Sequence, residues 1–186
     1  MAESQFRKDT KDADVEMQWR SVEGDIARGL AEHGRFADLL IVGQGDTENP
    51  PMLEPFLLPQ KVVMESGIPV LVIPIAPIKA FSIGQRILVS WDGSREAARA
   101  VHDSLPLLRQ AGQVWLLAID PHRQIHIGSG ADPAAMAAHL ERHGISAEVV
   151  ETLSGERSVS EVLLANIKEV GADLLVMGAF GHSTNR

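Results

Sequence analysis

The sequence contains no cysteine, which excludes disulfide bonds, thiolate metal sites and a cysteine nucleophile. Basic residues are also in the minority, with 17 Lys and Arg against 25 Asp and Glu and a formal net charge of −8. Broad nucleic-acid binding is not expected, because phosphate contacts require clustered Lys and Arg and no basic stripe is present. The longest apolar runs are strand-sized, and the mixed-charge N-terminus lacks the apolar segment of a signal peptide. We therefore expect a cytoplasmic protein that does not enter a membrane.

Patterns typical of catalysis are equally scarce. Neither a Ser/His/Asp arrangement nor a pair of catalytic carboxylates can be assembled from the spacing, so the sequence does not predict an enzyme. His139 and His143 are four residues apart on an expected helix, a spacing that suits two metal ligands. The sequence offers no third ligand and no known metal motif beside them. We therefore interpret both histidines as surface residues.

The chain contains one motif twice. Residues 37–43 read Ala-Asp-Leu-Leu-Ile-Val-Gly, and residues 172–178 read Ala-Asp-Leu-Leu-Val-Met-Gly. The spacing from Asp38 to Asp173 is the size of a small domain, which indicates a repeated domain and not a short solenoid repeat. Each copy of the motif follows a glycine and a helix-like segment, so the two copies share more than one strand.

Each copy is incomplete. Residues 86–94 open the second copy and have no equivalent in the first, and residues 68–74 close the first copy and have no equivalent in the second. The sequence thus predicts a portion of a longer tandem protein. We expect a partial first domain over residues 1–77, and a second domain over residues 84–186 without its last helix and strand.

Short apolar runs alternate with helix-like segments along the chain. We predict strands over residues 15–22, 38–43, 70–73, 87–90, 114–119, 147–152 and 173–177, and helices over residues 24–35, 62–66, 94–111, 132–143 and 159–170. The continuous apolar character of residues 38–43 is typical of a parallel strand that is buried on both faces. This alternation predicts an α/β fold with a Rossmann-like, doubly wound parallel sheet.

Unusual residues follow two of the expected strands in the second copy. Asp92 comes after the first of them, and Gly178 and Gly181 come after the last. Ligands of open parallel sheets bind beyond the carboxyl ends of strands, where the strand order reverses. If these two strand ends are adjacent, they form a crevice with a carboxylate on one wall and a glycine-rich turn on the other. A ribose hydroxyl and an anionic phosphate suit these two walls, so the constellation indicates a nucleotide.

Simpler roles for the same residues stay open. Asp92 would equally cap the following helix or shape the turn, and Gly178 and Gly181 would equally be turn glycines. The first copy offers a weaker pattern, because Gly43 and Gly45 have a different spacing and a run of acidic and proline residues follows. Carboxylates there would repel a phosphate, so we expect no second site in the first copy.

The second copy resembles a universal stress protein (UspA-like) domain, and the whole chain resembles part of a tandem universal stress protein. The similarity is carried by residues 87–94 and 172–183, and in the first copy by residues 37–43 and 66–74. It implies an adenine nucleotide alpha hydrolase-like fold with a five-stranded parallel sheet. It further implies dimeric pairing through the last strand and a role in stress survival.

The resemblance also implies a ligand. In ATP-binding members of the family, an aspartate after the first strand contacts the nucleoside, and a Gly-x-x-Gly followed by a Gly-Ser or Gly-Thr pair cradles the phosphates. Asp92, Met177, Gly178 and Gly181 match such positions, which implies ATP with Mg²⁺. The sequence stops at Arg186, before the second pair, so it carries at most half of the implied phosphate cradle.

Three functions stay open at this point. The first is a stress-response protein whose second domain binds ATP as a regulatory ligand, with slow hydrolysis or none. The second is an interaction module that binds no nucleotide and serves dimerisation and partner contact. The third is an adenylate-forming or hydrolytic enzyme of related fold. The lone edge at Val70–Ile73 predicts a homodimer joined through that strand.

Overall fold

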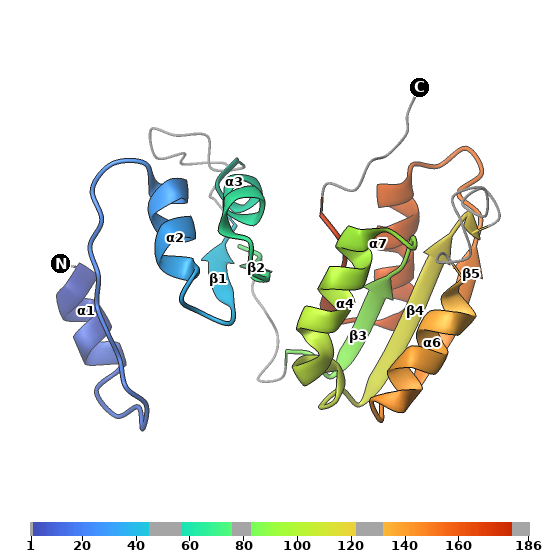
Figure 1. Cartoon of the computed structure of the whole chain (residues 1–186), viewed down its shortest axis with the longest axis horizontal. Coiled ribbons are helices and arrows are strands. Elements are labelled where there is room, and N and C mark those ends of the chain that lie inside the picture. The colour runs from blue at the N-terminus through green and yellow to red at the C-terminus, as the bar shows by residue number, and fades with distance from the viewer. Residues whose placement is uncertain (1, 45–56, 76–82, 122–131, 180–186) are drawn as a thin grey trace. The chain divides into compact units, whose positions relative to one another are not determined.

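The computed structural model describes residues 2–44, 57–75, 83–121 and 132–179. The chain divides into two compact units, unit 1 over Met1–Pro77 and unit 2 over Ile78–Arg186 (Figure 1). The elements of unit 1 are α1 (Ala2–Asp9), α2 (Ile26–Gly34), β1 (Leu40–Gly43), α3 (Leu57–Ser66) and β2 (Val70–Ile73). β1 and β2 pair in parallel, and the register aligns each residue of Leu40–Gly43 with one of Val70–Ile73.

The core of unit 1 lies between its short sheet and two helices. Val42 of β1 packs with Ala27 of α2 and Val62 of α3, and all three are at most 5% exposed. The helix α2 begins at Asp25, whose carboxylate accepts a hydrogen bond from the backbone N–H of Arg28 (3.1 Å). An aspartate in this capping position satisfies an N–H group that would otherwise lack a partner.

Two predictions for unit 1 are wrong. Residues 15–22 form no strand, because Val22 lies against Gly29 of α2 and not beside the sheet, which leaves the segment no strand to pair with. The expected burial of residues 38–43 on both faces also fails, since Ile41 is 62% exposed. Within the described part of unit 1, helices cover only the face of the sheet that carries Val42.

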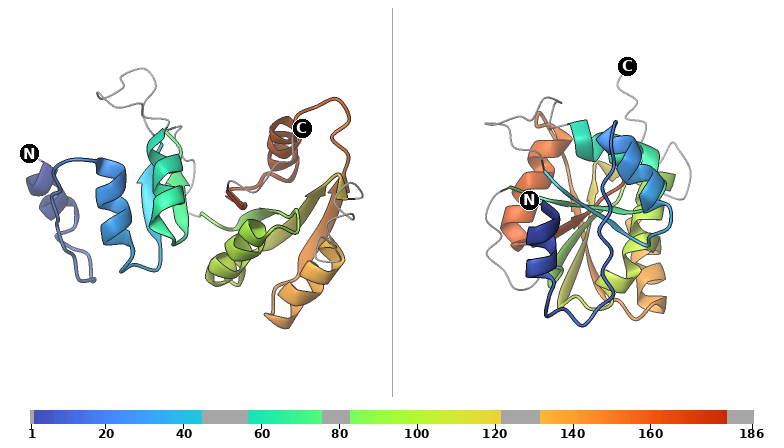
Figure 2. Two further views of the ribbon diagram at one scale, coloured as in Figure 1. Left: turned by 45° about the horizontal axis from the view of Figure 1, so that its top comes forward. Right: turned by 90° about the vertical axis from the view of Figure 1, so that its left-hand side faces the viewer.

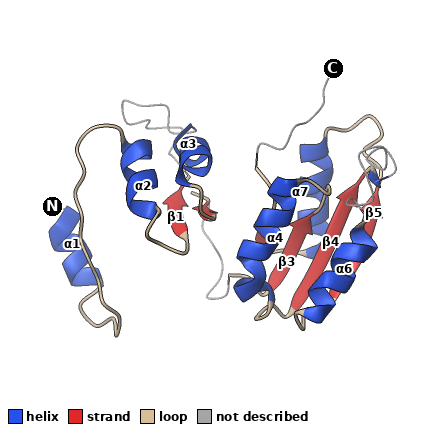
Figure 3. Ribbon diagram, in the orientation of Figure 1, coloured by secondary structure: helices blue, strands red, loops and turns tan. Residues whose placement is uncertain are grey.

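Unit 2 is a parallel α/β domain. Its elements are β3 (Arg86–Ser90), α4 (Arg95–Leu108), β4 (Gln113–Ile119), α6 (Pro133–Arg142), β5 (Ala147–Thr152), α7 (Val159–Val170) and β6 (Leu174–Val176). The four strands are parallel and lie in the order β5-β4-β3-β6. Helices and strands alternate along the chain (Figure 3), so the predicted doubly wound sheet is confirmed.

Helices cover both faces of this sheet. Figure 2 shows α7 on one face and α4 with α6 on the other. Ile87 and Val89 of β3 point toward α4 and α6 and belong to the same core cluster as Leu140. Leu88, the residue between them, packs with Val162 of α7. The strands are therefore apolar on both sides, as the uninterrupted hydrophobic runs predict.

Asp173 fixes the start of β3 against β6. Its carboxylate accepts hydrogen bonds from the backbone N–H groups of Gly84, Gln85 and Arg86 at 3.0 to 3.1 Å. The Arg86 guanidinium lies 4.9 Å from the centre of the Trp115 ring, a cation–π distance. The hydrogen bonds of Asp173 hold β3 in register with β6, which determines what lies at the opposite ends of these two strands.

Candidate functional site

The two strand ends singled out by the sequence are neighbours. From β3 the chain proceeds outward through β4 to β5, and then crosses back so that β6 lies on the other side of β3. Val89 of β3 is aligned with Val176 of β6, so the segments that follow these strands leave the sheet side by side. The strand order reverses between β3 and β6, which is where doubly wound sheets bind their ligands.

Asp92 shapes the turn between β3 and α4. Its Oδ1 atom accepts a hydrogen bond from the backbone N–H of Ser94 (2.9 Å), and the left-handed Gly93 (φ 74°) lies between them. Ser94 then caps α4 by accepting the backbone N–H of Ala97 (3.1 Å), as the sequence predicts. The Asp92 side chain is exposed, and its Oδ2 atom takes no part in the turn. The turn role is therefore present, and it does not use the Oδ2 atom.

Gly178 makes a close contact between the two tips. A Cβ atom at this position would lie 2.6 Å from the backbone nitrogen of Ala97 and 2.7 Å from the carbonyl carbon of Glu96. The end of β6 thus lies against the backbone of the first turn of α4, and only glycine fits. Met177, just before it, is 50% exposed at the same edge. Gly181 belongs to residues 180–186, outside the described part of the chain.

The charges around these tips are mixed. The Arg95 guanidinium donates a hydrogen bond to the Glu96 carboxylate, which raises the arginine pKa. Glu96 is the less exposed partner, at 24% of its side chain against 87% for Arg95. Together with Asp92, the described tips present two carboxylates and one guanidinium. Such a surface suits a hydroxyl or amino donor near Asp92.

Sequence reasoning missed a second linkage at the same edge. Asp120, directly after β4, has φ 50°, and its carboxylate accepts hydrogen bonds from the N–H (3.0 Å) and the hydroxyl (2.5 Å) of Ser154 after β5. Aspartate tolerates this backbone region better than most residues, and Ser154 is only 8% exposed. The ends of β4 and β5 are therefore tied together, and no spacing in the sequence marks the pair.

Other expected features can be placed as well. The His139 and His143 rings lie 4.7 Å apart, and no group of three His, Asp or Glu side chains within the described ranges could hold a metal ion. None of the described helices is long and apolar enough to cross a membrane. Gly45 and the acidic, proline-rich run of the first copy fall in residues 45–56, outside the described ranges.

Comparison with known proteins identifies the family. A model of the universal stress protein family matches residues 84–186, which is more than half of the chain. The chain therefore belongs to the universal stress protein family, a family of stress-response proteins that are in general not enzymes. A search of curated proteins found no match.

Several solved structures are similar to the chain. A universal stress protein from Archaeoglobus fulgidus matches with a TM-score of 0.71 and 16% identity, over 95% of this chain and 64% of that protein. The match to a universal stress family protein from Burkholderia pseudomallei has a TM-score of 0.38 and 24% identity, and it covers 54% of this chain and 85% of that protein. The match to a Mycobacterium tuberculosis protein has a TM-score of 0.42 and 22% identity, and it covers 57% of this chain and 79% of that protein. At these identities the first similarity shows the fold alone, and the chain spans less than two thirds of that relative.

Proposed function

We propose that the chain is a cytoplasmic stress-response protein whose unit 2 binds an adenine nucleotide, ATP with Mg²⁺, as a regulatory ligand. The supporting observation is the alignment of Val89 with Val176, which puts Asp92 and Gly178 at adjacent strand ends. Nucleotides bind doubly wound sheets at this kind of switch point. No catalytic pair is present in the sequence, so the ligand is bound without being turned over rapidly.

The described residues suit the nucleoside end of ATP. The Oδ2 atom of Asp92 is an exposed acceptor for a ribose hydroxyl, and the half-exposed Met177 offers an apolar surface to a base. Asparagine at position 92 would keep an oxygen for the Ser94 N–H but would remove the charge.

The phosphate end would be held by backbone N–H groups of the glycine turn that begins at Gly178. Glycines let such groups approach an anion closely. Bound Mg²⁺ would supply positive charge to the phosphates, which reduces their repulsion by Asp92 and Glu96. Gly181 is part of this proposal through its position in the sequence.

Calorimetric titration of the full 186-residue chain with Mg·ATP tests this function. Asp92→Asn is expected to weaken binding by about tenfold, the usual effect of losing a hydrogen bond to a charged group. Asp132→Asn is the matched control, since Asp132 caps α6 in the same unit and asparagine caps a helix equally well. An absence of heat with the wild-type chain would reject nucleotide binding. Equal affinity of both variants would reject the role of Asp92.

A second function, an interaction module, is favoured by a different observation. Val72 of β2 is 41% exposed, and β1 is the sole described strand that pairs with β2. An open apolar edge of this kind pairs readily with another chain. We therefore propose a homodimer joined through Val70–Ile73, whether or not a nucleotide binds.

Light scattering distinguishes this dimer from the nucleotide function. Val72→Lys is expected to give a monomer, because a charge on an edge strand blocks pairing. Leu164→Lys, at a 58% exposed position of α7, is the control and is expected to stay dimeric. A monomeric wild-type chain would exclude the dimer without affecting the calorimetric test. Turnover of ATP that Asp92→Ala abolishes would instead support the enzyme alternative.

A further inference from the structure

Three imidazole rings meet where α4 faces α6 in unit 2. The ring of His102 on α4 lies 5.1 Å from that of His139 on α6, and the His139 ring lies 4.7 Å from that of His143. The ring planes are tilted by 54° and 59° to each other, and because His139 contacts both of the other rings the three form one cluster. We call these three residues the imidazole cluster. It lies outside the proposed nucleotide site and plays no part in it.

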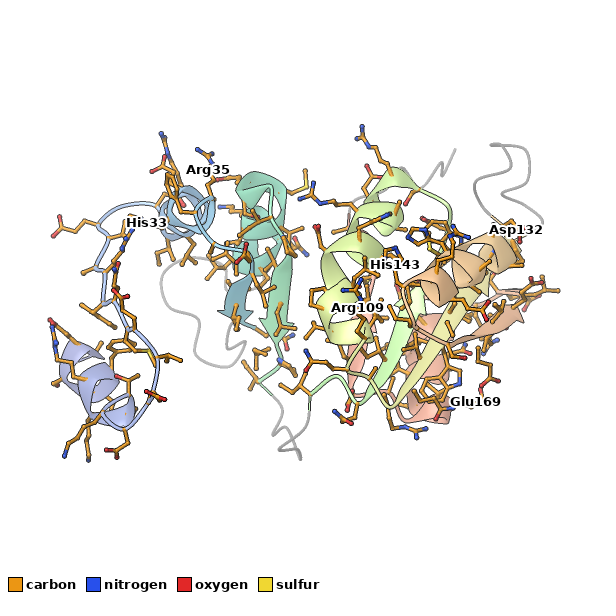
Figure 4. All side chains as sticks on the ribbon, turned by 60° about the horizontal axis from the view of Figure 1, so that its bottom comes forward. His33, Arg35, Arg109, Asp132, His143 and Glu169 are labelled. Atoms are coloured by element: carbon orange, nitrogen blue, oxygen red, sulfur yellow. The ribbon has the colours of Figure 1, made fainter. Side chains whose placement is uncertain are left out.

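Two arginines contact this cluster. Nη2 of Arg109 donates to Nδ1 of His143 (3.2 Å), and Nη2 of Arg142 approaches Nδ1 of His139 (3.4 Å). Figure 4 labels Arg109 and His143, which lie close together. A guanidinium group can only donate hydrogen bonds, so each of these Nδ1 atoms must be an acceptor. An imidazolium has no acceptor nitrogen, so both contacts favour the neutral form of the ring.

The remaining contacts also disfavour a cation. Nε2 of His139 is buried and has no hydrogen-bond partner within the described residues, so an imidazolium there would lack an acceptor on that side. Burial, followed by the charges of His143, His102 and Arg142, lowers the pKa of His139 from its ordinary value of 6.5. The Nδ1–H group of His102 donates to the carbonyl oxygen of Ala98 (2.7 Å), a bond that survives protonation.

The neighbouring elements provide little compensating negative charge. On α4, the Asp103 carboxylate is paired with Arg99 (2.6 Å). On α6, Glu141 is exposed, and the strand β4 has no charged residue. Glu151 of β5 lies on the same face of the sheet, at the end opposite the loop that joins α6 to β5. Among the described residues, the charged side chains with a hydrogen-bond contact to the cluster are Arg109 and Arg142.

We propose that the contact between α4 and α6 is a pH-sensitive joint. It holds while the neutral His139 ring packs against His102 of α4 and His143 accepts a hydrogen bond from Arg109 at the end of α4, and it weakens when His139 takes up a proton in mildly acidic solution. The unfolded chain binds a proton at His139 near the ordinary pKa of 6.5, whereas in the folded chain the pKa of this residue is lowered. Stability is therefore complete above that pH and is lost as the pH falls below it.

Urea unfolding of the full chain tests the joint. Trp91 and Trp115 are both 5% exposed and lie in unit 2, so a Trp19→Phe background limits the fluorescence signal to that unit. Between about pH 7.5 and about pH 5.5, the range in which histidine titrates, the urea midpoint is expected to fall. The fall should be roughly twofold larger in this background than after a further change of His139→Gln and His143→Gln.

His33 in unit 1 provides the matched control. Its Nδ1 atom also accepts from an arginine, Arg20 (3.0 Å), but the pair is exposed and lies outside unit 2. His33→Gln should leave the fall in the unit 2 midpoint unchanged. An equal fall with and without His139 and His143 would overturn the proposal.

Proton NMR of the wild-type chain provides a second test that needs no variant. The chain has seven histidines, whose ring protons report each titration directly. The proposal expects His139 to titrate below the ordinary histidine pKa. It is contradicted if His139 titrates at the ordinary value.

Discussion

The same seven-residue motif lies in different surroundings in the two units. Ile41 in unit 1 is 62% exposed, whereas Val176, at the same position of the motif in unit 2, is 8% exposed. In unit 2 the face that carries Val176 is covered by α4 and α6. In the described part of unit 1, helices lie only over the opposite face. The burial of a strand is thus determined by the layers around it as much as by its own residues.

The next position of the motif shows the opposite contrast. Val42 is 5% exposed and Met177 is 50% exposed. The strand β1 continues to Gly43 along β2, whereas β6 ends at Val176, so Met177 leaves the sheet at its carboxyl edge. The same position of the motif is therefore a core position in unit 1 and an exposed position at the candidate site in unit 2.

The largest difference in stability loss between the two copies is expected when their matching glycines are replaced by alanine. Gly178→Ala should destabilise unit 2 by about 3 kcal/mol, because the added methyl group meets the backbone of Glu96 and Ala97. Gly43→Ala, at the matching position, meets nothing within 4 Å and should change stability by less than about 0.5 kcal/mol. Urea titrations of both variants measure the contrast. Equal losses would show that the close contact at Gly178 does not exist.

The second largest difference in stability loss is expected at the two motif aspartates, Asp173 and Asp38. Asp173→Ala removes the acceptor of three backbone N–H groups at the start of β3, and should cost about 2 kcal/mol after allowance for exposure. Asp38 is exposed and accepts no such bonds from the described residues, so Asp38→Ala should be nearly neutral. Hydrogen exchange at the Gly84 and Arg86 amides should accelerate only in the first variant. Unchanged exchange would mean that Asp173 does not hold β3.

A smaller difference in stability loss is expected between the covered strand face in unit 2 and the uncovered one in unit 1. Val176→Ala should cost about 1.5 kcal/mol, from two buried methyl groups. Ile41→Ala should cost less than about 0.5 kcal/mol if the exposed face stays in water. Calorimetric melting of both variants at low and high protein concentration checks this. A large, concentration-dependent loss for Ile41→Ala would show that a second chain covers this face.

The smallest effect concerns helix capping. Ser158 and Glu161 form a reciprocal capping box at the start of α7, and Ser158→Ala should cost about 1 kcal/mol. The hydrogen bond from the Ser158 backbone, then that from its hydroxyl, lowers the pKa of Glu161. This stabilisation is present above the ordinary carboxyl pKa and is lost as the pH falls through the lowered one. Circular dichroism melts should therefore show a slightly smaller acid sensitivity in the variant, which loses the hydroxyl but keeps the backbone donor. Identical sensitivity would exclude a contribution of the hydroxyl.

Much of the fold is predictable from local sequence patterns. The strand at residues 147–152 and the helix at 159–170 match the predicted bounds, because apolar runs and capping residues such as Ser158 are local signals. The predicted strand at residues 15–22 is wrong because alternation alone does not tell whether a partner strand lies nearby. Burial on both faces of 38–43 fails for the same reason, since it depends on a second helix layer.

The candidate site is predictable only in part. The sequence identifies the residues that follow these two strands, but the adjacency of the β3 and β6 ends is only a condition there and is shown by the structure. The backbone contact at Gly178 and the Asp120–Ser154 linkage depend on how distant segments approach each other. The imidazole cluster was missed because its third ring, His102, comes from another helix.

Photolabelling with an azido-adenine analogue of ATP tests the nucleotide site most directly. After irradiation and proteolysis, mass spectrometry should find the label on peptides from the β3 and β6 ends, which contain Asp92 and Met177. Excess ATP should suppress this labelling. Label that appears mainly on unit 1 peptides, or that excess ATP does not reduce, would contradict a nucleotide site at the edge between β3 and β6.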